Sequence, residues 1–600
     1  MATVTADSAA PAGETAPPLS GAATSARWAG PSAAAGVLLL LVADLPRWSS
    51  GVWAPKMAVL LVMGAAGLPL LVARAAGRDR WPDRLATRPA ALAAVAFVVV
   101  AAASAAASPA GIAAAVGLYG QGTGLVFVAC LAGMWALGTA THGDAVWAGR
   151  SGRAWVELAV VAGAVVNAAV GIGQEVFHLT GLVPGDKSFA TGLLGNPAYL
   201  GAACAAGLAL LGGRATAQPW RWLGPVVLLG LAIGASGERL SALSALAIAV
   251  LEVGCAAAGR RRHRDASPVL GRAAGFGTAI VFSVVVGSLL PAMRTHGSAG
   301  VLGRAAHSTV ANTVTGRVDA WRAGLAALGH RPLLGSGPGQ FRDAIAATLT
   351  PHQARSVDLS IFVGAHDLVV EYATTTGVLG LVAVVAWLVL AARRRRGRLV
   401  IAAGALLLCA LSQPMEAATT PLLFLLLGAA RLAPAPVADA AAVERRGPAR
   451  LRSPGRWLVV VTAAAAAVAV VAGGALVVGD HSYARAEHAL ASHRPVQAAA
   501  AARAADGALF AWPEPASLLA RADAAAGHRQ AALRADDVAR SRDPADPALW
   551  VACAEAALSA GRPGVARTDV RQALRLEPTD GAAAMLLAGL AHGRAVGAVR

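Results

Sequence analysis

The chain has 600 residues, of which 56% are hydrophobic and only 14% are charged. This composition is unlike that of soluble globular domains and indicates an integral membrane protein. The formal net charge of +18 could accompany nucleic-acid binding, but the basic residues lie between apolar runs and not in one soluble region. Membrane orientation alone accounts for that charge, so we predict no nucleic-acid partner.

Residues 1–27 are rich in Ala, Pro, Thr and Ser without periodicity, and they lack the basic start and apolar core of a secretory signal. We predict that they form a disordered cytoplasmic tail. Apolar runs long enough to cross a bilayer follow. About 12 to 13 membrane spans are predicted, at residues 28–45, 54–74, 88–108, 119–139, 154–174, 190–212, 222–237, 240–258, 271–292, 367–391, 398–412, 416–432 and 457–479.

Arginines follow every even-numbered span, as at residues 393–396 after the tenth. This distribution follows the positive-inside rule and predicts a multi-pass protein of the cytoplasmic (inner) membrane with a cytoplasmic N-terminus. The long loop 293–366 and all residues after 479 then face outward. We predict a membrane domain over 28–432, a basic cytoplasmic linker over 433–456, a last span over 457–479 and an outer domain over 480–600.

Small residues within the spans, such as Gly201, Gly207 and Gly212, are predicted to let helices pack closely in lipid. Four of the five cysteines lie in apolar runs, and Cys553 alone lies in a polar region. No disulfide is therefore expected within that region. No cluster of Cys and His has the spacing of a metal site, and we predict neither a metal nor another cofactor.

The outer region 480–600 contains Ala-rich amphipathic stretches separated by prolines, with Pro513 and Pro547 lying 34 residues apart. The final unit, 557–578, resembles a tetratricopeptide repeat, in which paired helices are ended by proline. We predict a soluble α-helical repeat domain that could dock an envelope protein or a glycan. The alternative is a helical cap without a ligand.

Two arginines break the orientation rule because they are predicted to lie on the outer side. Arg239 stands in a short turn between two spans, where its planar guanidinium suits a phosphate or diphosphate. Arg317 opens a predicted helix of the long loop and shares a helix face with Trp321. The alternatives are a lipid-headgroup anchor or a pair with Glu238 for Arg239, and a surface contact for Arg317.

A glycine turn and a histidine accompany these arginines in the long loop. Gly335, Gly337 and Gly339 could bring backbone N–H groups close to an oxyanion, although the turn lacks the sequence of a P-loop. His366 lies at the start of the tenth span, beside Asp367. Its imidazole could accept the proton of an attacking hydroxyl near neutral pH, or it could be structural.

These motifs resemble those of the O-antigen ligase and polymerase superfamily. The signature region corresponds to residues 316–380, and two earlier motifs correspond to Gly195-Asn196-Pro197 and Ser236-Gly-Glu-Arg239. The signature region contains Arg317-x3-Trp321, Pro332-Leu-Leu-Gly335-x-Gly337-x-Gly339-x-Phe341, His366 and Gly377-x2-Gly380. The resemblance covers about residues 30–432 and departs from the family at Asp367, where relatives often carry Asn.

The resemblance implies a GT-C-like helical enzyme with an undecaprenyl-diphosphate-linked glycan as donor. It places diphosphate binding on Arg239 and Arg317 and assistance of hydroxyl attack on His366. We further expect substrate contacts from Trp321, Gly335, Gly337, Gly339, Asn196, Glu238 and Asp367.

The predicted activity is a metal-independent, inverting glycan transfer to a lipid, protein or glycan acceptor at the outer face of the membrane. Two guanidinium groups could stabilise the charge that grows on the leaving diphosphate. A polymerase of lipid-linked repeat units is the main alternative. A transporter or flippase would also fit many spans. A membrane anchor for the repeat domain is a third alternative, for which so many spans are excessive. The sequence does not identify the sugar or the acceptor.

Overall fold

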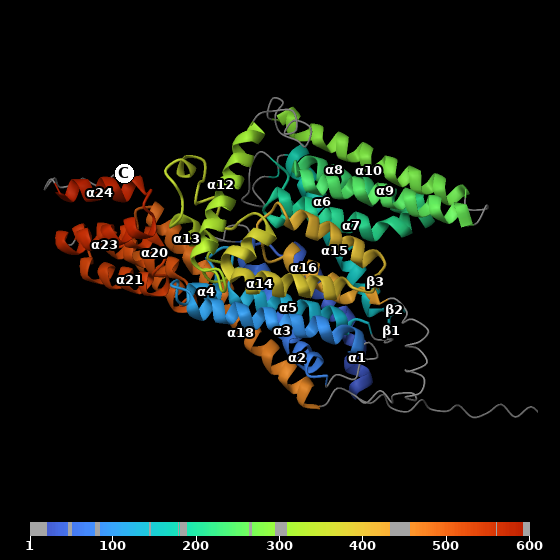
Figure 1. The fold of residues 1–600 in the computed structure, drawn as a ribbon, viewed down its shortest axis with the longest axis horizontal. Coiled ribbons are helices and arrows are strands. Elements are labelled where there is room, and N and C mark those ends of the chain that lie inside the picture. Colours follow the sequence, from blue (N-terminus) through green and yellow to red (C-terminus); the bar gives the residue numbers. More distant parts are fainter. Residues whose placement is uncertain are drawn as a thin grey trace, which may run out of the picture.

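The chain is almost entirely helical (Figure 1). The computed structural model describes residues 21–45, 51–77, 84–142, 146–177, 179, 189–262, 267–294, 309–432, 456–559 and 561–591. Within these residues it contains 22 α-helices, two 3-10 helices and two pairs of two-residue strands. The predicted all-α fold is confirmed.

Each of the thirteen predicted spans coincides with a helix. Among the described residues, eight of these helices are long and apolar enough to cross a membrane, which identifies a multi-pass membrane protein. They are α2 (Trp53–Ala75), α3 (Arg84–Ala107), α6 (Gly152–Val176), α7 (Pro197–Ala217), α9 (Arg239–Arg262), α10 (Ser267–Arg294), α14 (Leu368–Ala392) and α18 (Arg456–Ala491). The other five are α1 (Gly21–Val42), α5 (Leu125–Ala140), α8 (Pro219–Ser236), α15 (Arg398–Ala410) and α16 (Thr419–Ala429).

Glycines allow the membrane helices to approach closely, as predicted. At the contact of α2 with α5, a Cβ on Gly67 would lie 1.9 Å from the carbonyl oxygen of Gly133. A Cβ on Gly201 in α7 would lie 2.5 Å from the Ser241 hydroxyl oxygen in α9. Any larger residue would push these helices apart, and dispersion contacts between helices are a main source of stability in lipid.

The two ends of the bundle carry different structures (Figure 1). One end holds the strand pairs β1 (Val146–Trp147) with β2 (Arg150–Ser151) and β3 (Arg395–Arg396) with β4 (Arg431–Leu432). The other end holds α4 (Ala113–Val116), η1 (Gly192–Leu194), α12 (Thr309–His330), α13 (Phe341–Ala346), η3 (Gln353–Arg355) and the C-terminal helices. The first end carries the arginines that we predict to be cytoplasmic.

Several predicted boundaries need correction. Helix α5 begins six residues later than predicted because residues 119–124 form a turn, with Gly120 and Gly122 at positive φ. Helix α7 begins at Pro197, since Asn196 caps it and η1 occupies the preceding residues. The structure places residues 21–27 of the predicted tail in α1. The rest of the tail and residues 433–455 of the linker lie outside the described residues.

Beyond the membrane domain, consecutive helices stack against one another with a regular period. The helices α19, α21 and α23 begin at Pro495, Arg529 and Pro563, and the helices α20, α22 and α24 begin at Pro513, Pro547 and Gly581. Each helix of a series begins 34 residues after the one before it. They are α19 (Pro495–Ala508), α20 (Pro513–Ala525), α21 (Arg529–Arg542), α22 (Pro547–Ser559), α23 (Pro563–Leu576) and α24 (Gly581–Ala591). Membership of the tetratricopeptide family stays a prediction.

The repeat helices are attached directly to the membrane domain. Helix α18 continues twelve residues beyond the predicted end of the last span and packs against α19. From this extension Asp480 accepts a hydrogen bond from the Tyr119 hydroxyl at 2.5 Å. The indole nitrogen of Trp512 donates to the Gly117 carbonyl at 3.1 Å, and the Trp512 ring packs edge-on against Trp53. The repeats are therefore a fixed part of this end of the molecule.

Candidate functional site

The long loop between α10 and α14 folds around its own small hydrophobic core. Ala320 and Ala323 of α12 pack with Phe341 of α13, and Phe362 and Ala365 of the segment before α14 complete the centre of this core. Burial of these apolar side chains fixes α12 relative to the loop that carries His366. The loop therefore presents Arg317 and His366 from a packed scaffold.

The turn between α8 and α9 carries the second arginine. Gly237 adopts a left-handed conformation that ends α8, and Arg239 is the first residue of α9. The Glu238 carboxylate accepts a hydrogen bond from the Ser412 hydroxyl at 3.1 Å. Ser412 belongs to the connection between α15 and α16, so this connection forms another wall of the same region.

Arg317 links the two halves of the candidate site. Its pKa is lowered by burial, raised by the charge of Glu238 and lowered by the charge of Arg239. The same Arg317 charge acts on the imidazole of His366. Glu238, Arg239 and His366 thus each lie close enough to Arg317 for electrostatic interaction with its charge, although positions 238 and 366 are 128 residues apart in sequence.

His366 is held in an unusual local conformation. Its φ is +53°, in the left-handed region that residues with a side chain rarely adopt. The imidazole Nε2 lies 3.2 Å from the Ile361 carbonyl oxygen, and the ring packs near Phe362. A carbonyl oxygen only accepts hydrogen bonds, so we assign the proton of the neutral ring to Nε2. The lone pair of Nδ1 then remains available to a substrate.

The His366 imidazole is neutral over a wide pH range. Burial, followed by the positive charge of Arg317, lowers its pKa to about 4, while the hydrogen bond to Ile361 opposes the shift. Both main causes disfavour the imidazolium form. At neutral pH the ring is therefore unprotonated, and its low pKa makes it a weaker base than a free imidazole.

Two side chains expected to contact substrate cap helices, and their contact with substrate stays a prediction. The Asp367 carboxylate accepts hydrogen bonds from the backbone N–H groups of Val369 and Val370, each at 2.8 Å, at the start of α14. The Asn196 side chain accepts one from Ala198 at 2.9 Å at the start of α7. Asn and Asp are both favoured at this helix position. The departure from the family at Asp367 therefore preserves the capping function of the residue.

The glycine turn has a packing role. The Gly335 N–H donates to the Arg331 carbonyl, and the Gly337 N–H donates to the Thr375 carbonyl, both at 2.9 Å. The turn fits against a break in α14 at Gly377, whose φ is +68°. A Cβ on Gly339 would lie 3.1 Å from the Gly124 backbone nitrogen. The N–H groups of Gly335 and Gly337 therefore bind the protein backbone, and contact of the turn with an oxyanion stays a prediction.

Trp321 and Glu371 contact the backbone directly before His366. The indole nitrogen of Trp321 donates to the Ala365 carbonyl at 2.7 Å, and a carboxylate oxygen of Glu371 accepts from the Ala365 N–H at 2.7 Å. Trp321 was expected to contact substrate, whereas its polar atom binds the protein. The sequence analysis did not select Glu371 or Ser412, because neither the hydrogen bond to Ala365 nor that to Glu238 has a sequence signal.

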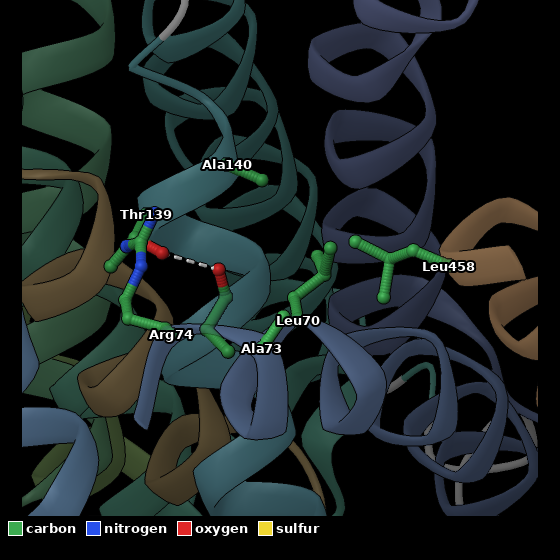
Figure 2. Close-up of a pocket in the computed structure, with 7 residues that line it drawn as sticks. Leu70, Ala73, Arg74, Thr139, Ala140 and Leu458 are labelled. Carbon is green, nitrogen blue, oxygen red and sulfur yellow. Dashed lines mark hydrogen bonds between the residues drawn. The ribbon is translucent and has the colours of Figure 1, made fainter. Parts of the chain in front are cut away.

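A cavity at the opposite end of the bundle is not part of this site. It lies between the ends of α2 and α5 and the start of α18 (Figure 2). Its lining is mostly apolar, and Arg74 is its only charged side chain. The lining residues are Leu70, Ala73, Arg74, Ala136, Thr139, Ala140 and Leu458.

Comparison with known proteins finds a family match within the membrane domain. Residues 224–385 match the O-Antigen ligase family. The matched segment contains Glu238, Arg239, Arg317 and His366, together with the loop that brings them together. No curated protein matches the chain.

The fold is that of a multi-pass membrane protein. The matched segment, 162 of the 600 residues, is similar to a family of the glycosyl transfer and polymerisation class. The matched segment ends before the repeat helices, whose family therefore stays a prediction.

Proposed function

We propose that the chain transfers a glycan from an undecaprenyl-diphosphate carrier to an acceptor hydroxyl at the outer face of the cytoplasmic membrane. One observation supports this most directly. Arg317 lies close enough to both Arg239 and His366 for its charge to interact with each of them. Two cations beside a neutral base provide the groups that transfer from a lipid-linked diphosphate requires.

In this proposal Arg239 and Arg317 bind the diphosphate. A guanidinium group presents several N–H donors in a plane and keeps its charge at all physiological pH values. Negative charge grows on the diphosphate as its bond to the sugar breaks, so two nearby cations stabilise the transition state more than the ground state. Glu238 lies beside them and limits the net positive charge of the empty site.

His366 acts as the general base. The acceptor hydroxyl oxygen attacks the anomeric carbon while its proton passes to Nδ1 of His366. The bond from that carbon to the diphosphate oxygen breaks, and undecaprenyl diphosphate leaves with the electron pair. Attack opposite the leaving group inverts the anomeric carbon. The arginines supply the charge stabilisation that a divalent cation provides in metal-dependent transferases.

The repeat helices favour a ligase over a polymerase. They lie at the same end of the molecule as α12 and α13, where a large lipid, protein or glycan acceptor would approach (Figure 1). A polymerase of lipid-linked repeat units would use the same chemistry with a glycan hydroxyl as acceptor. The two activities differ in product size, which gel electrophoresis of the glycan measures.

The proposal predicts that Arg239→Ala and Arg317→Ala each lower glycan transfer about 100-fold or more, because each removes a cation that faces the leaving group. The full chain is expressed in a strain lacking its own copy, and release of undecaprenyl diphosphate from the lipid-linked glycan is measured. Arg322→Ala is the matched control, since Arg322 lies on the same helix with 69% of its side chain exposed. Full transfer by both the Arg239 and the Arg317 variant would contradict the proposal.

A further inference from the structure

The backbone of Ala365 is held from both sides. Its carbonyl accepts a hydrogen bond from the Trp321 indole at 2.7 Å, and its N–H donates to the Glu371 carboxylate at 2.7 Å. Ala365 has no exposed surface, and Glu371 is also buried. These two hydrogen bonds fix the plane of the peptide groups that lead directly into His366.

This arrangement connects the two predicted reacting groups. Trp321 lies four residues after Arg317 on α12, about one helical turn away, so both side chains leave the same face of the helix. Glu371 lies in the first turn of α14, the helix that begins directly after His366 and Asp367. The Ala365 peptide is therefore the point at which α12, which carries Arg317, is attached to the segment that carries His366.

The contacts also explain how His366 keeps its left-handed backbone. A residue with a side chain at φ +53° costs free energy, and the surrounding structure must hold it there. Gly364 contributes to the fit, because a Cβ at this position would lie 3.2 Å from the Glu371 carboxylate oxygen. Without the two hydrogen bonds, the peptide before His366 could rotate and turn the imidazole away from Arg317.

We propose that Trp321 and Glu371 are positioning residues that hold the imidazole of His366 in register with Arg317 for glycan transfer. This inference rests on the proposed function. It differs from the expectation that Trp321 contacts substrate, because here the indole acts through its N–H group on the backbone. The proposal requires a hydrogen-bond donor at position 321 for the Ala365 carbonyl and a hydrogen-bond acceptor at position 371 for the Ala365 N–H.

The variants separate these hydrogen bonds from packing. Trp321→Phe removes the N–H donor and keeps an aromatic ring, and Glu371→Leu removes the acceptor and keeps a buried side chain of similar size. Glu371→Gln retains a carbonyl oxygen that can accept from Ala365. Trp220→Phe serves as the control for a tryptophan replacement, since Trp220 is 86% exposed.

We expect Trp321→Phe and Glu371→Leu to lower kcat about 10- to 100-fold while KM for the lipid-linked glycan changes less than about twofold, because displacing a base by about 1 Å has effects of that size. Glu371→Gln and Trp220→Phe should retain most of the wild-type kcat. Transfer is assayed with lipid-linked glycan extracted from a strain lacking the chain. Binding of undecaprenyl diphosphate to each purified variant in nanodiscs should match that of the wild type.

A pH profile provides a readout that a purely structural role would not change. Loosening His366 exposes it to water and moves it from Arg317, so the acid limb of kcat/KM should shift upward in the two defective variants. Wild-type kcat and an unchanged acid limb in both Trp321→Phe and Glu371→Leu would overturn the inference. Loss of undecaprenyl diphosphate binding in both variants would also overturn it, since the defect would then be in donor binding. Absence of transfer by the wild type would instead contradict the proposed function.

Discussion

At the scale of single residues, the account depends on the protonation of His366. Burial and Arg317 lower the pKa of the imidazole from 6.5 to about 4, so the neutral base is retained well below neutral pH. We predict that kcat/KM falls only as the pH approaches about 4, because this ratio reports ionisations of the free enzyme. The measurement is the pH profile of glycan transfer in nanodiscs.

Arg317→Gln gives the sign of the electrostatic effect. It removes a positive charge that disfavours the imidazolium, so the His366 pKa rises and the acid limb moves toward higher pH, in addition to the loss of rate. The low pKa of His366 also makes folding stability depend on pH. Because the folded pKa is lower than the unfolded value, His366 costs stability progressively as pH falls from about 6.5 to about 4. An acid limb that is unmoved in Arg317→Gln would show that the two groups do not interact.

The sequence predicted some of these residues for sound physical reasons and missed others. Arg239 and Arg317 stood out because the positive-inside rule does not explain a cation on the outer side. His366 stood out because an imidazole titrates near neutral pH. Glu371 could not be selected, since its partner is a backbone N–H group six residues away in a segment without regular structure. The packing role of the glycine turn could not be predicted, because the sequence does not reveal that α14 breaks at Gly377 and accepts hydrogen bonds from the turn.

At the scale of elements, the break in α14 is the feature that the glycine turn requires. The Val378 N–H donates to the Pro332 carbonyl at 2.8 Å in place of a helix partner, and the Gly337 N–H donates to Thr375 on the other side of the break. The N–H and carbonyl groups freed by the break are thus satisfied by the turn, as backbone groups at membrane depth must be. Thr375 lies nine residues after His366, so the turn supports α14 about two helical turns beyond its start.

Gly377→Ala tests this element. A Cβ would lie 2.3 Å from the Leu333 carbonyl oxygen, and the left-handed backbone would cost roughly 1–3 kcal/mol in addition. We predict a lower thermal unfolding temperature in detergent and reduced glycan transfer. Gly404→Ala is the control, because a Cβ there would meet nothing within 4 Å. Equal stability of the two variants would show that the break can be closed without cost.

The regular elements were predictable, and their ends were less so. Thirteen apolar runs were located because crossing a bilayer requires a long apolar helix. The 34-residue spacing was visible from the prolines alone. The start of α5 was misplaced because residues 119–124, Tyr-Gly-Gln-Gly-Thr-Gly, were counted into the apolar run that follows them, whereas their glycines form a turn. The length of α18 was underestimated because the apolar run ends at residue 479, whereas the helix continues with polar residues to Ala491.

At the scale of the whole molecule, the repeat helices are joined to the loop that carries the site. Arg342 of α13 pairs with Asp343 at 2.9 Å and with Asp546 before α22 at 2.8 Å. Phe341, the residue before Arg342, lies in the small core that also contains Phe362 and Ala365. Movement of the repeat helices relative to the membrane domain would therefore shift Phe341 and, through the small core, the segment before His366.

Arg342→Ala should loosen this junction. It leaves Asp343 and Asp546 without their shared cation, and breaking a buried ion pair from one side commonly costs about 3–5 kcal/mol. We predict faster hydrogen–deuterium exchange in α13 and α22 and a partial loss of transfer. Arg529→Ala is the control, since Arg529 is exposed on α21. Unchanged exchange in both helices would show that the pair does not hold the junction.

The same junction should weaken as pH rises. Burial raises the pKa of Glu514 to about 7, and burial together with Asp343 and Asp546 raises that of Asp543 to about 8. These carboxyl groups stabilise the junction fully at pH values below their unfolded pKa, and this contribution is lost as pH rises through their folded pKa. Protection factors in α22, which correct for the base-catalysed intrinsic exchange rate, should therefore fall between about pH 4 and 8, and Asp543→Asn should reduce that fall.

The central claim is that Arg239, Arg317 and His366 form one site for a lipid-linked diphosphate. Electron cryo-microscopy of the full chain in nanodiscs with undecaprenyl diphosphate tests it most directly. We predict density for the diphosphate between the guanidinium groups of Arg239 and Arg317, within hydrogen-bonding distance of both, with the His366 ring facing it. Diphosphate density at the opposite end of the bundle, beside Arg74 in the cavity of Figure 2, would contradict the account.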